Sequence, residues 1–278
     1  MESIQKLRWQ DVINDVLVPS DYRFEWVKMV FKEGYESYNR DGLFVYGTNG
    51  CAEVSPLLGY FDRDLDCLLS AIDTLSKPWP LPLRSDVSLN SLVTRDEEIV
   101  DELLNYEAVK LKVHSKVDCE RVKKVRDLYG DKLKIRLDLN GAFDVSEATE
   151  IIKDLSSVDI EFIEQPCRSN QDCASVRKKI DVPVALDESV RNLAQLAEVK
   201  NLDSADILVV KIQPCGGLHK SINLVDSWGK DVVVSNLMES KVGVDVGLAL
   251  ARSLDKLNYA CGLVQSPLEK LIREPLDI

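Results

Sequence analysis

Beyond residue 85 the chain repeats one pattern, in which a short apolar run is followed by a longer stretch with apolar residues at helical spacing. The run VKLKVH at 109–114 alternates apolar and polar positions, as the two faces of a β-strand do. Such runs predict strands at Val87–Val93, Val109–His114, Leu133–Asn140, Ile160–Gln165, Val184–Glu188, Ile207–Gln213, Val232–Asn236 and Tyr259–Leu263. The stretches between them predict helices such as Asp118–Leu128, Val145–Leu155, Leu193–Val199 and Leu218–Trp228.

The predicted strands follow one another at the interval of one strand–helix unit, which is the repeat of a parallel sheet. Eight strands joined by seven helices would form an α/β fold, a (β/α)7β TIM-like barrel. An open doubly wound sheet is the alternative. We favour the barrel because so many of the predicted strands end in polar residues, which an open sheet does not usually show.

The part of the chain before the barrel has a different pattern. Arg23–Val30 alternates like a strand, and Gly42–Tyr46 followed by Thr48-Asn49-Gly50 predicts a hairpin. Asp64–Leu75 has apolar positions at helical spacing, and the proline-rich run KPWPLP that follows it predicts a linker. The expected division is an α+β capping domain at 1–84, the (β/α)7β barrel at 85–263, and a tail at 264–278 that packs back on the capping domain.

Charge and composition exclude several classes of partner. The chain of 278 residues has a formal net charge of -12, which argues against binding to nucleic acid or to an anionic membrane. We expect no membrane-spanning segment, and the start MESIQKLRWQ lacks the basic and apolar regions of a signal peptide. The seven cysteines form no CxxC pair, which predicts reduced thiols and a cytoplasmic location.

Polar residues stand at the C-terminal ends of the predicted strands, where barrels of this kind carry their active sites. They are Lys110, Lys112 and His114; Arg136, Asp138 and Asn140; Glu164 and Gln165; Asp187 and Glu188; Lys211 and Gln213; and Ser235 and Asn236. Asp138, Glu164 and Asp187 follow three successive strands, so we expect them to converge on one point. Three carboxylates suit Mg²⁺, although any one of them alone could instead cap the next helix.

The lysines predict proton-transfer chemistry. Lys112 and Lys211 are expected on strands across the barrel from each other, with the metal between them. Lysine is a useful base when its pKa is lowered, and we expect Lys110 and the metal to lower the pKa of Lys112. Removing a proton next to a carboxylate creates an enediolate, which a divalent cation and ammonium groups stabilise. For Lys110, a plain ion pair with a neighbouring carboxylate is the alternative role.

Two further segments have simpler interpretations. Pro214-Cys215-Gly216-Gly217 could cradle a phosphate, but no GxGxxG or Walker pattern accompanies it, so we favour a turn into a helix. Glu239 and Ser240 are typical of a helix start, and Glu239 could also touch a substrate.

Five barrel segments, in chain order, resemble the motifs of one known family. They are Lys110–Lys112, Arg136–Ala142, Glu164–Pro166, Asp187–Ser189 and Val210–Pro214. By these motifs the sequence resembles the muconate-lactonizing-enzyme subgroup of the enolase superfamily. Within it, the chain is most similar to the o-succinylbenzoate synthase family, particularly its actinobacterial type, with additional similarity at Glu53–Leu57, Val234–Leu237 and Tyr259–Leu263.

The resemblance implies a hydro-lyase that converts 2-succinyl-6-hydroxy-2,4-cyclohexadiene-1-carboxylate to 2-succinylbenzoate by syn-dehydration through an enediolate, a step of menaquinone biosynthesis. It implies that Lys112 removes the α-proton and helps the hydroxyl leave, while Lys211 stabilises the enediolate. Mg²⁺, or Mn²⁺ in its place, would be bound by Asp138, Glu164 and Asp187. The other predicted site residues are Lys110 as a third catalytic group and Arg136, Asn140, Ser235 and Glu239 as contacts of a small-molecule carboxylate substrate.

Two other functions stay open. An N-acylamino-acid racemase or dipeptide epimerase on the same scaffold would use the same motifs, with both lysines as opposed acid and base. A non-catalytic binding protein would be expected to lack some lysines or carboxylates, and none is missing. The capping domain departs from the family's pattern at Glu25 and at Cys51-Ala52, which bears on substrate preference more than on the chemistry.

Overall fold

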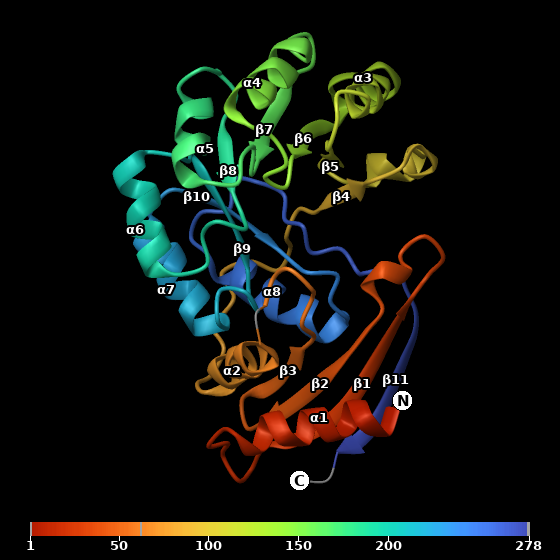
Figure 1. The fold of residues 1–278 in the computed structure, drawn as a ribbon, viewed down its shortest axis with the longest axis vertical. Helices are drawn as coiled ribbons and strands as arrows, with labels where there is room; N and C mark the ends of the chain where they lie inside the picture. Colours follow the sequence, from red (N-terminus) through yellow and green to blue (C-terminus); the bar gives the residue numbers. More distant parts are fainter. Residues whose placement is uncertain (1, 62, 277–278) are drawn as a thin grey trace.

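The computed structural model describes residues 2–61 and 63–276, which form a barrel with a smaller capping unit beside it (Figure 1). The parallel strands of the barrel are β4 (Asn90–Val93), β5 (Ala108–Lys112), β6 (Lys134–Asp138), β7 (Ile160–Glu164), β8 (Val184–Leu186), β9 (Ile207–Lys211) and β10 (Asp231–Ser235). They are hydrogen-bonded in sequence order, from β4 to β10. The helices of the barrel are α3 (Asp118–Tyr129), α4 (Val145–Asp154), α5 (Asn170–Arg177), α6 (Leu193–Leu202), α7 (Leu218–Trp228) and α8 (Lys241–Ser253).

A short segment near the C-terminus closes the ring between the two end strands. Cys261 forms a parallel bridge with Leu89, just ahead of β4, and Gly262 forms one with Ser235 at the end of β10. A Cβ on Gly262 would lie 2.6 Å from Ser235 Oγ, so this close approach requires glycine. The predicted (β/α)7β barrel is confirmed, with its eighth strand reduced to these two bridges.

The first crossover of the barrel differs from the prediction of seven helices. Between β4 and β5 the structure has two short 3-10 helices, η2 (Asp96–Glu98) and η3 (Asp101–Asn105), in place of an α-helix. The run DEEIVDELLN has few apolar positions to bury against the sheet, and η3 buries only Leu103. An α-helix would gain little from packing there.

The capping unit is an antiparallel sheet of order β11-β1-β2-β3 with two helices against it. Its elements are α1 (Glu2–Asn14), β1 (Arg23–Phe31), β2 (Arg40–Gly47), β3 (Gly50–Val54), α2 (Asp64–Leu75) and β11 (Leu268–Leu276). The tail strand β11 pairs with β1 from Phe24–Leu276 to Phe31–Leu268, so the last part of the chain returns to the capping unit. The domain division at residues 84 and 85 stays a prediction.

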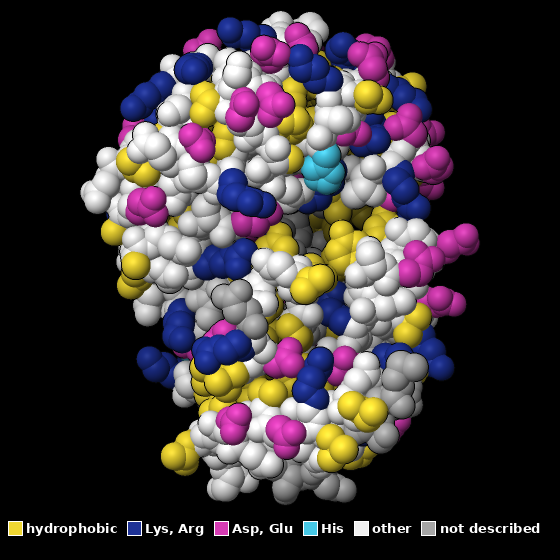
Figure 2. Space-filling model, viewed as in Figure 1, with side chains coloured by type: hydrophobic (Ala, Val, Ile, Leu, Met, Phe, Trp, Pro, Cys, Tyr) yellow, Lys and Arg dark blue, Asp and Glu magenta, His cyan; other side chains and the backbone are white. Residues whose placement is uncertain are grey.

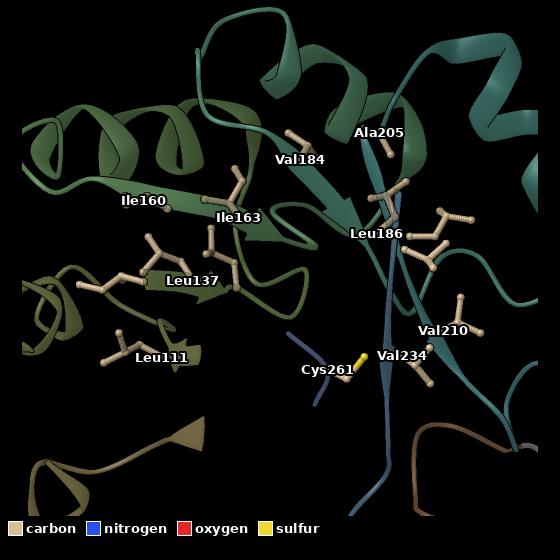
Figure 3. Packing of buried hydrophobic residues seen from close by; sticks show 14 of the residues in the cluster. Leu111, Leu137, Ile160, Ile163, Val184, Leu186, Ala205, Val210, Val234 and Cys261 are labelled. Atoms are coloured by element: carbon tan, nitrogen blue, oxygen red, sulfur yellow. The ribbon is translucent and has the colours of Figure 1, made fainter. Parts of the chain in front are cut away.

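The largest apolar core lies between the barrel strands and their helices, where Leu111, Leu137 and Val210 belong to one cluster (Figure 3). A smaller cluster inside the barrel contains Phe162 and Val209. Successive strand residues point to opposite sides, so the apolar residues of β5 face the helices and its lysines face the barrel interior. The polar face predicted at 109–114 is therefore part of the inner wall of the barrel.

Candidate active site

Strand register brings the first part of the site together. Lys112 is the register partner of Asp138, and Asp138 is the partner of Glu164, so the three lie at one level of the barrel wall. Asp187 directly follows β8, and Lys211 ends β9 on the other side of the ring. The three carboxylates are buried, with 1% to 4% of their surface exposed. On the outer surface, a hollow lies between the barrel and the capping unit (Figure 2).

The Lys110 ammonium bridges two of these carboxylates. Its Nζ lies 3.0 Å from Asp138 Oδ2, and 2.9 and 3.1 Å from the two oxygens of Glu164. Burial alone would lower the pKa of Lys110, but the charges of Asp138 and Glu164 outweigh it and raise that pKa above its usual value. Burial and the charge of Asp138 also raise the pKa of Glu164 to about 7. Lys110 therefore makes the ion pair that we gave as its alternative role, and a catalytic role for it stays a prediction.

Lys112 approaches Asp138 from the open side. Its Nζ donates to Asp138 Oδ2 and to Asn140 Oδ1, each at 2.7 Å. Burial would raise the pKa of Asp138, but the charges of Lys110 and Lys112 hold it well below its usual range. The Lys112 side chain is 22% exposed and that of Lys110 is 12% exposed, so Lys112 is the more accessible of the two.

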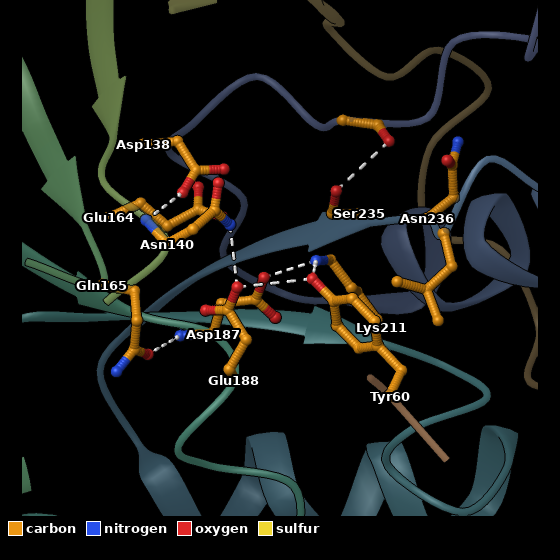
Figure 4. A network of polar contacts seen from close by, with 12 residues as sticks. Tyr60, Asp138, Asn140, Glu164, Gln165, Asp187, Glu188, Lys211, Ser235 and Asn236 are labelled. Carbon is orange, nitrogen blue, oxygen red and sulfur yellow. Dashed lines mark hydrogen bonds and ion pairs between the residues drawn. The ribbon is translucent and has the colours of Figure 1, made fainter. Parts of the chain in front are cut away.

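A second group of contacts forms around Lys211 (Figure 4). The Lys211 ammonium pairs with Asp187 and donates to the Tyr60 hydroxyl at 3.1 Å. The Glu188 carboxylate accepts from Asn140 Nδ2 at 2.8 Å and from the Tyr60 hydroxyl at 3.4 Å. Because Asn140 also accepts from Lys112, these contacts connect both sides of the barrel mouth.

The three carboxylates predicted to share a metal ion are divided between two ion-paired groups. Lys110 joins Asp138 and Glu164, whereas Asp187 is paired with Lys211. Within residues 2–61 and 63–276, no three His, Cys, Asp or Glu side chains are grouped as metal ligands. In this arrangement ammonium groups are the counter-ions of the carboxylates, and the sharing of one metal ion by all three stays a prediction.

The donor set nevertheless fits Mg²⁺. Carboxylate oxygens are the hard ligands that this ion prefers, and all three carboxylates lie at strand ends of the same barrel face. Burial and the neighbouring negative charge of Asp138 raise the pKa of Glu164, so additional positive charge would favour the ionised form of this group.

Two of the predicted substrate contacts lie beside the lysines. Asn140 contacts Lys112, and its φ of 45° is a left-handed conformation that asparagine tolerates better than most residues. Such backbone conformations cluster at functional sites. Ser235 is the register partner of Lys211.

Arg136 lies deeper in the barrel. In register it is level with Lys110, and its side chain is wholly buried. The guanidinium pairs with Glu161 and donates to Asn90 Oδ1 at 3.0 Å and to the Ala260 carbonyl. These contacts place Arg136 in the barrel floor, and its contact with a substrate stays a prediction.

Glu239, the fourth predicted substrate contact, lies under the capping unit and is 3% exposed. It accepts from the Gln213 amide and, at 3.4 Å, from the Leu237 N–H. Burial and the charge of Glu53 raise the pKa of Glu239 to about 7, although the Gln213 hydrogen bond and the charge of Arg40 oppose the shift. Its contacts are with protein groups.

This shift predicts a pH-dependent stability. The charged or titratable groups around Glu239 are Glu53 on β3, Arg40 on β2 and Cys67 on α2. Because the folded pKa is raised, Glu239 favours the folded state most below about pH 4.5, and this contribution is lost as pH rises to about 7. In the original protein this loss should lower the free energy of unfolding by roughly 3 kcal/mol over that pH range, and Glu239→Gln should remove it. Urea unfolding at several pH values measures the difference. Equal slopes in both proteins would contradict this.

Tyr60 is a site residue that the sequence pattern did not indicate. It lies between β3 and α2, in an apolar run without strand or helix spacing, and reaches Lys211 only through the fold. Its ring centroid lies 4.8 Å from Lys211 Nζ and 5.0 Å from the Arg191 guanidinium carbon. Glu188 was among the polar strand ends, but its contact with Asn140 was not predicted.

The glycine pair after β9 leads into α7, whose first N–H groups are capped by a carboxylate of the capping unit. The first-turn N–H groups of His219 and Lys220 donate to Asp73 Oδ2 of α2, at 2.9 and 3.2 Å. A Cβ on Gly217 would overlap the Asp73 carboxylate, so glycine lets α2 approach α7. The segment is a turn into a helix, as we favoured.

Comparisons with known proteins identify the family of this chain. Residues 93–278 match the family described as enolase C-terminal domain-like. The o-succinylbenzoate synthase of Thermobifida fusca is 36% identical over 234 residues, which are 81% of this chain and 74% of that protein. The o-succinylbenzoate synthase of Mycolicibacterium smegmatis is 32% identical over 236 residues, covering 81% of this chain and 73% of that protein.

Solved structures show the same fold at lower identity. The L-Ala-D/L-Glu epimerase of Bacillus subtilis is 17% identical with a TM-score of 0.77, and the match covers 90% of each chain. A dipeptide epimerase of Enterococcus faecalis is 18% identical with a TM-score of 0.73, over 92% of this chain and 97% of that one. The protein is therefore an enzyme of the enolase superfamily and belongs, within it, to the o-succinylbenzoate synthase family of carbon–oxygen lyases.

Proposed function

We propose that this enzyme dehydrates 2-succinyl-6-hydroxy-2,4-cyclohexadiene-1-carboxylate to 2-succinylbenzoate, the reaction of menaquinone biosynthesis that its family membership implies. The observation that carries the proposal is the pair Lys112 and Lys211, which end strands on opposite sides of the ring and contact strand-end carboxylates. This arrangement suits a carboxylate substrate whose enediolate, planar at the reacting carbon, would be held between two amines.

In the proposed mechanism, Lys112 enters as the free amine. Its Nζ takes the proton from the carbon next to the substrate carboxylate, and the electrons of the broken C–H bond form the enediolate. The enediolate collapses, the carbon–oxygen bond to the ring hydroxyl breaks, and the departing oxygen takes a proton from the Lys112 ammonium to leave as water. Lys211, kept as an ammonium beside Asp187, stabilises the enediolate charge from the other side.

The proposed cofactor is Mg²⁺ or Mn²⁺, held by Asp138, Glu164 and Asp187. When bound, the ion would offset the charge of the substrate carboxylate. Support comes from the donor set described above and from a dipeptide epimerase of Enterococcus faecalis whose structure is a complex with Mg and a dipeptide.

The function is tested by mixing purified enzyme with the substrate and following formation of the aromatic product. We expect turnover with Mg²⁺, loss of at least about 100-fold after chelation with EDTA, and recovery when Mg²⁺ is restored. Full activity in EDTA would contradict the metal assignment, and absence of product with Mg²⁺ would contradict the reaction.

An N-acylamino-acid racemase or dipeptide epimerase is the second candidate, because two opposed lysines could also exchange a proton on both faces of one carbon. The same preparation should therefore be incubated with N-succinylamino acids and dipeptides, and the optical rotation followed. Racemisation without dehydration would favour this candidate.

We infer that the enzyme acts on a small-molecule carboxylate in the cytoplasm. All seven cysteines are free thiols, as expected of a reducing compartment. Every helix within residues 2–61 and 63–276 is too short or too polar to span a bilayer. The charge of -12 does not favour nucleic acid as a partner.

A further inference from the structure

Gln213 is a barrel residue whose side chain is enclosed by the capping unit. It lies two residues beyond Lys211, and its side chain is 4% exposed. Its Oε1 accepts from the Ser55 N–H at 3.1 Å and from Cys67 Sγ at 2.7 Å. Its Nε2 donates to Ser55 Oγ at 3.3 Å and to the Glu239 carboxylate. One amide therefore joins the end of β3, helix α2 and the loop before α8.

The same interface contains two helix caps supplied by the capping unit. Glu53 of β3 accepts from the N–H groups of Ser240 and Gly243, at 3.0 and 3.2 Å, in the first turn of α8. Asp73 of α2 caps the first turn of α7, as described above. Carboxylates at helix N-termini are favourable because the N–H groups there lack partners within the helix. The capping unit is thus fastened to the helices that follow β9 and β10.

Gln213 differs from these caps because it is tied directly to the end of β9. The Cys215 N–H donates to the Lys211 carbonyl at 3.1 Å, and the Gly216 N–H donates to the Gln213 carbonyl at 3.0 Å. From the capping unit, Tyr60 contacts the Lys211 ammonium. Movement of the capping unit relative to this turn would therefore change the Lys211–Tyr60 contact.

We propose that Gln213 is a positioning residue that fastens the capping unit to the strand end carrying Lys211, an inference that rests on the role proposed above for Lys211. The amide suits this place because it donates and accepts at once. Glu53 and Glu239 already place two carboxylates nearby. A glutamate in place of Gln213 would add a third carboxylate and could not donate the hydrogen bond that Glu239 accepts. Misplacement of a catalytic group by about 1 Å can cost on the order of 100-fold in rate.

The test exchanges the amide of Gln213 and the carboxylate of Glu239. Gln213→Glu alone should lower kcat by about tenfold or more and lower the thermal midpoint, with a smaller change in KM. The double variant Gln213→Glu/Glu239→Gln keeps one amide facing one carboxylate, because the new carboxylate can accept from Ser55, Cys67 and the new amide. It should recover kcat to within about threefold of the original protein.

Thr74→Val is the matched control. Thr74 Oγ1 accepts from the Leu218 N–H at 3.1 Å across the same interface, so its hydrogen bond is to the start of α7 and not to Gln213. This variant should lower the thermal midpoint and leave kcat nearly unchanged. A purely structural role for Gln213 would instead make Gln213→Glu behave like Thr74→Val, with lower stability and unchanged kcat, and would overturn the inference. So would failure of the double variant to recover kcat.

If the proposed function is wrong, the original protein itself gives a different result from the one expected above. The original protein would then show no dehydration, and the same variants would be compared by racemisation, which also requires Lys211. An original protein with neither activity would remove the basis of the inference together with the proposed function.

Discussion

Replacing Lys112 by alanine should lower kcat for dehydration by about 10³-fold or more, because the proposed mechanism uses this one amine first as base and then as acid. The fold should survive, since Asp138 would keep its ion pair with Lys110 at 3.0 Å. The measurement is kcat with saturating Mg²⁺, together with the thermal midpoint of the variant.

The control for this prediction is Lys116→Ala. Lys116 pairs with Glu150 on the surface, where both side chains are more than half exposed, and exposed pairs of this kind contribute little. We expect unchanged kcat in this variant. If Lys112→Ala kept more than about a tenth of the activity, proton transfer would have to be assigned to another group.

Arg136→Met should cost about 3–5 kcal/mol of unfolding free energy, since it removes a wholly buried guanidinium and takes the shortest ion pair from Glu161, whose side chain is only 14% exposed. Glu161 would lose the ion pair with Arg136 and keep only a longer contact with Lys134 at 3.4 Å. Asn90 Oδ1 and the Ala260 carbonyl would also lose their donor. Urea unfolding measures the effect, and the m-value shows whether the denatured state has changed.

Arg177→Met is the comparison for this substitution. Arg177 also pairs with carboxylates, those of Asp203 and Asp206, but its side chain is 27% exposed and theirs are 62% and 34% exposed. We expect a loss of about 1 kcal/mol or less. Similar losses in the two variants would contradict the structural importance assigned to Arg136.

Local patterns were sufficient for the barrel and for the sides of the strands on which the candidate site residues lie. Alternation in 109–114 placed both lysines of β5 on the inner wall, because side-chain direction in a strand has a strict period of two. The carboxylates follow their strands directly, and parallel strands bring such ends to one side of the ring. The helix Asp64–Leu75 was predicted with its observed bounds for the same reason, since periodicity is a local property.

Local patterns were weaker where a residue's environment comes from distant parts of the chain. Strand β11 was not predicted because several of its side chains are charged and outward-facing, and its pairing with β1 joins opposite ends of the sequence. Arg136 and Asp138 share one face of β6, so alternation alone could not show that the Arg136 side chain is enclosed by Asn90, Glu161 and the Ala260 carbonyl. How deeply a side chain is buried inside the barrel depends on strand register and on the side chains that pack beneath it.

The sequence by itself determined the α/β barrel, the inward lysines and the strand-end carboxylates, since each follows from spacing along a single strand or helix. The tertiary structure alone decided which charges pair, that Tyr60 reaches Lys211, and that Glu239 and Gln213 are enclosed by the capping unit. These contacts join segments more than 20 residues apart, up to about half the chain, and ion pairs depend on distances that no local pattern specifies.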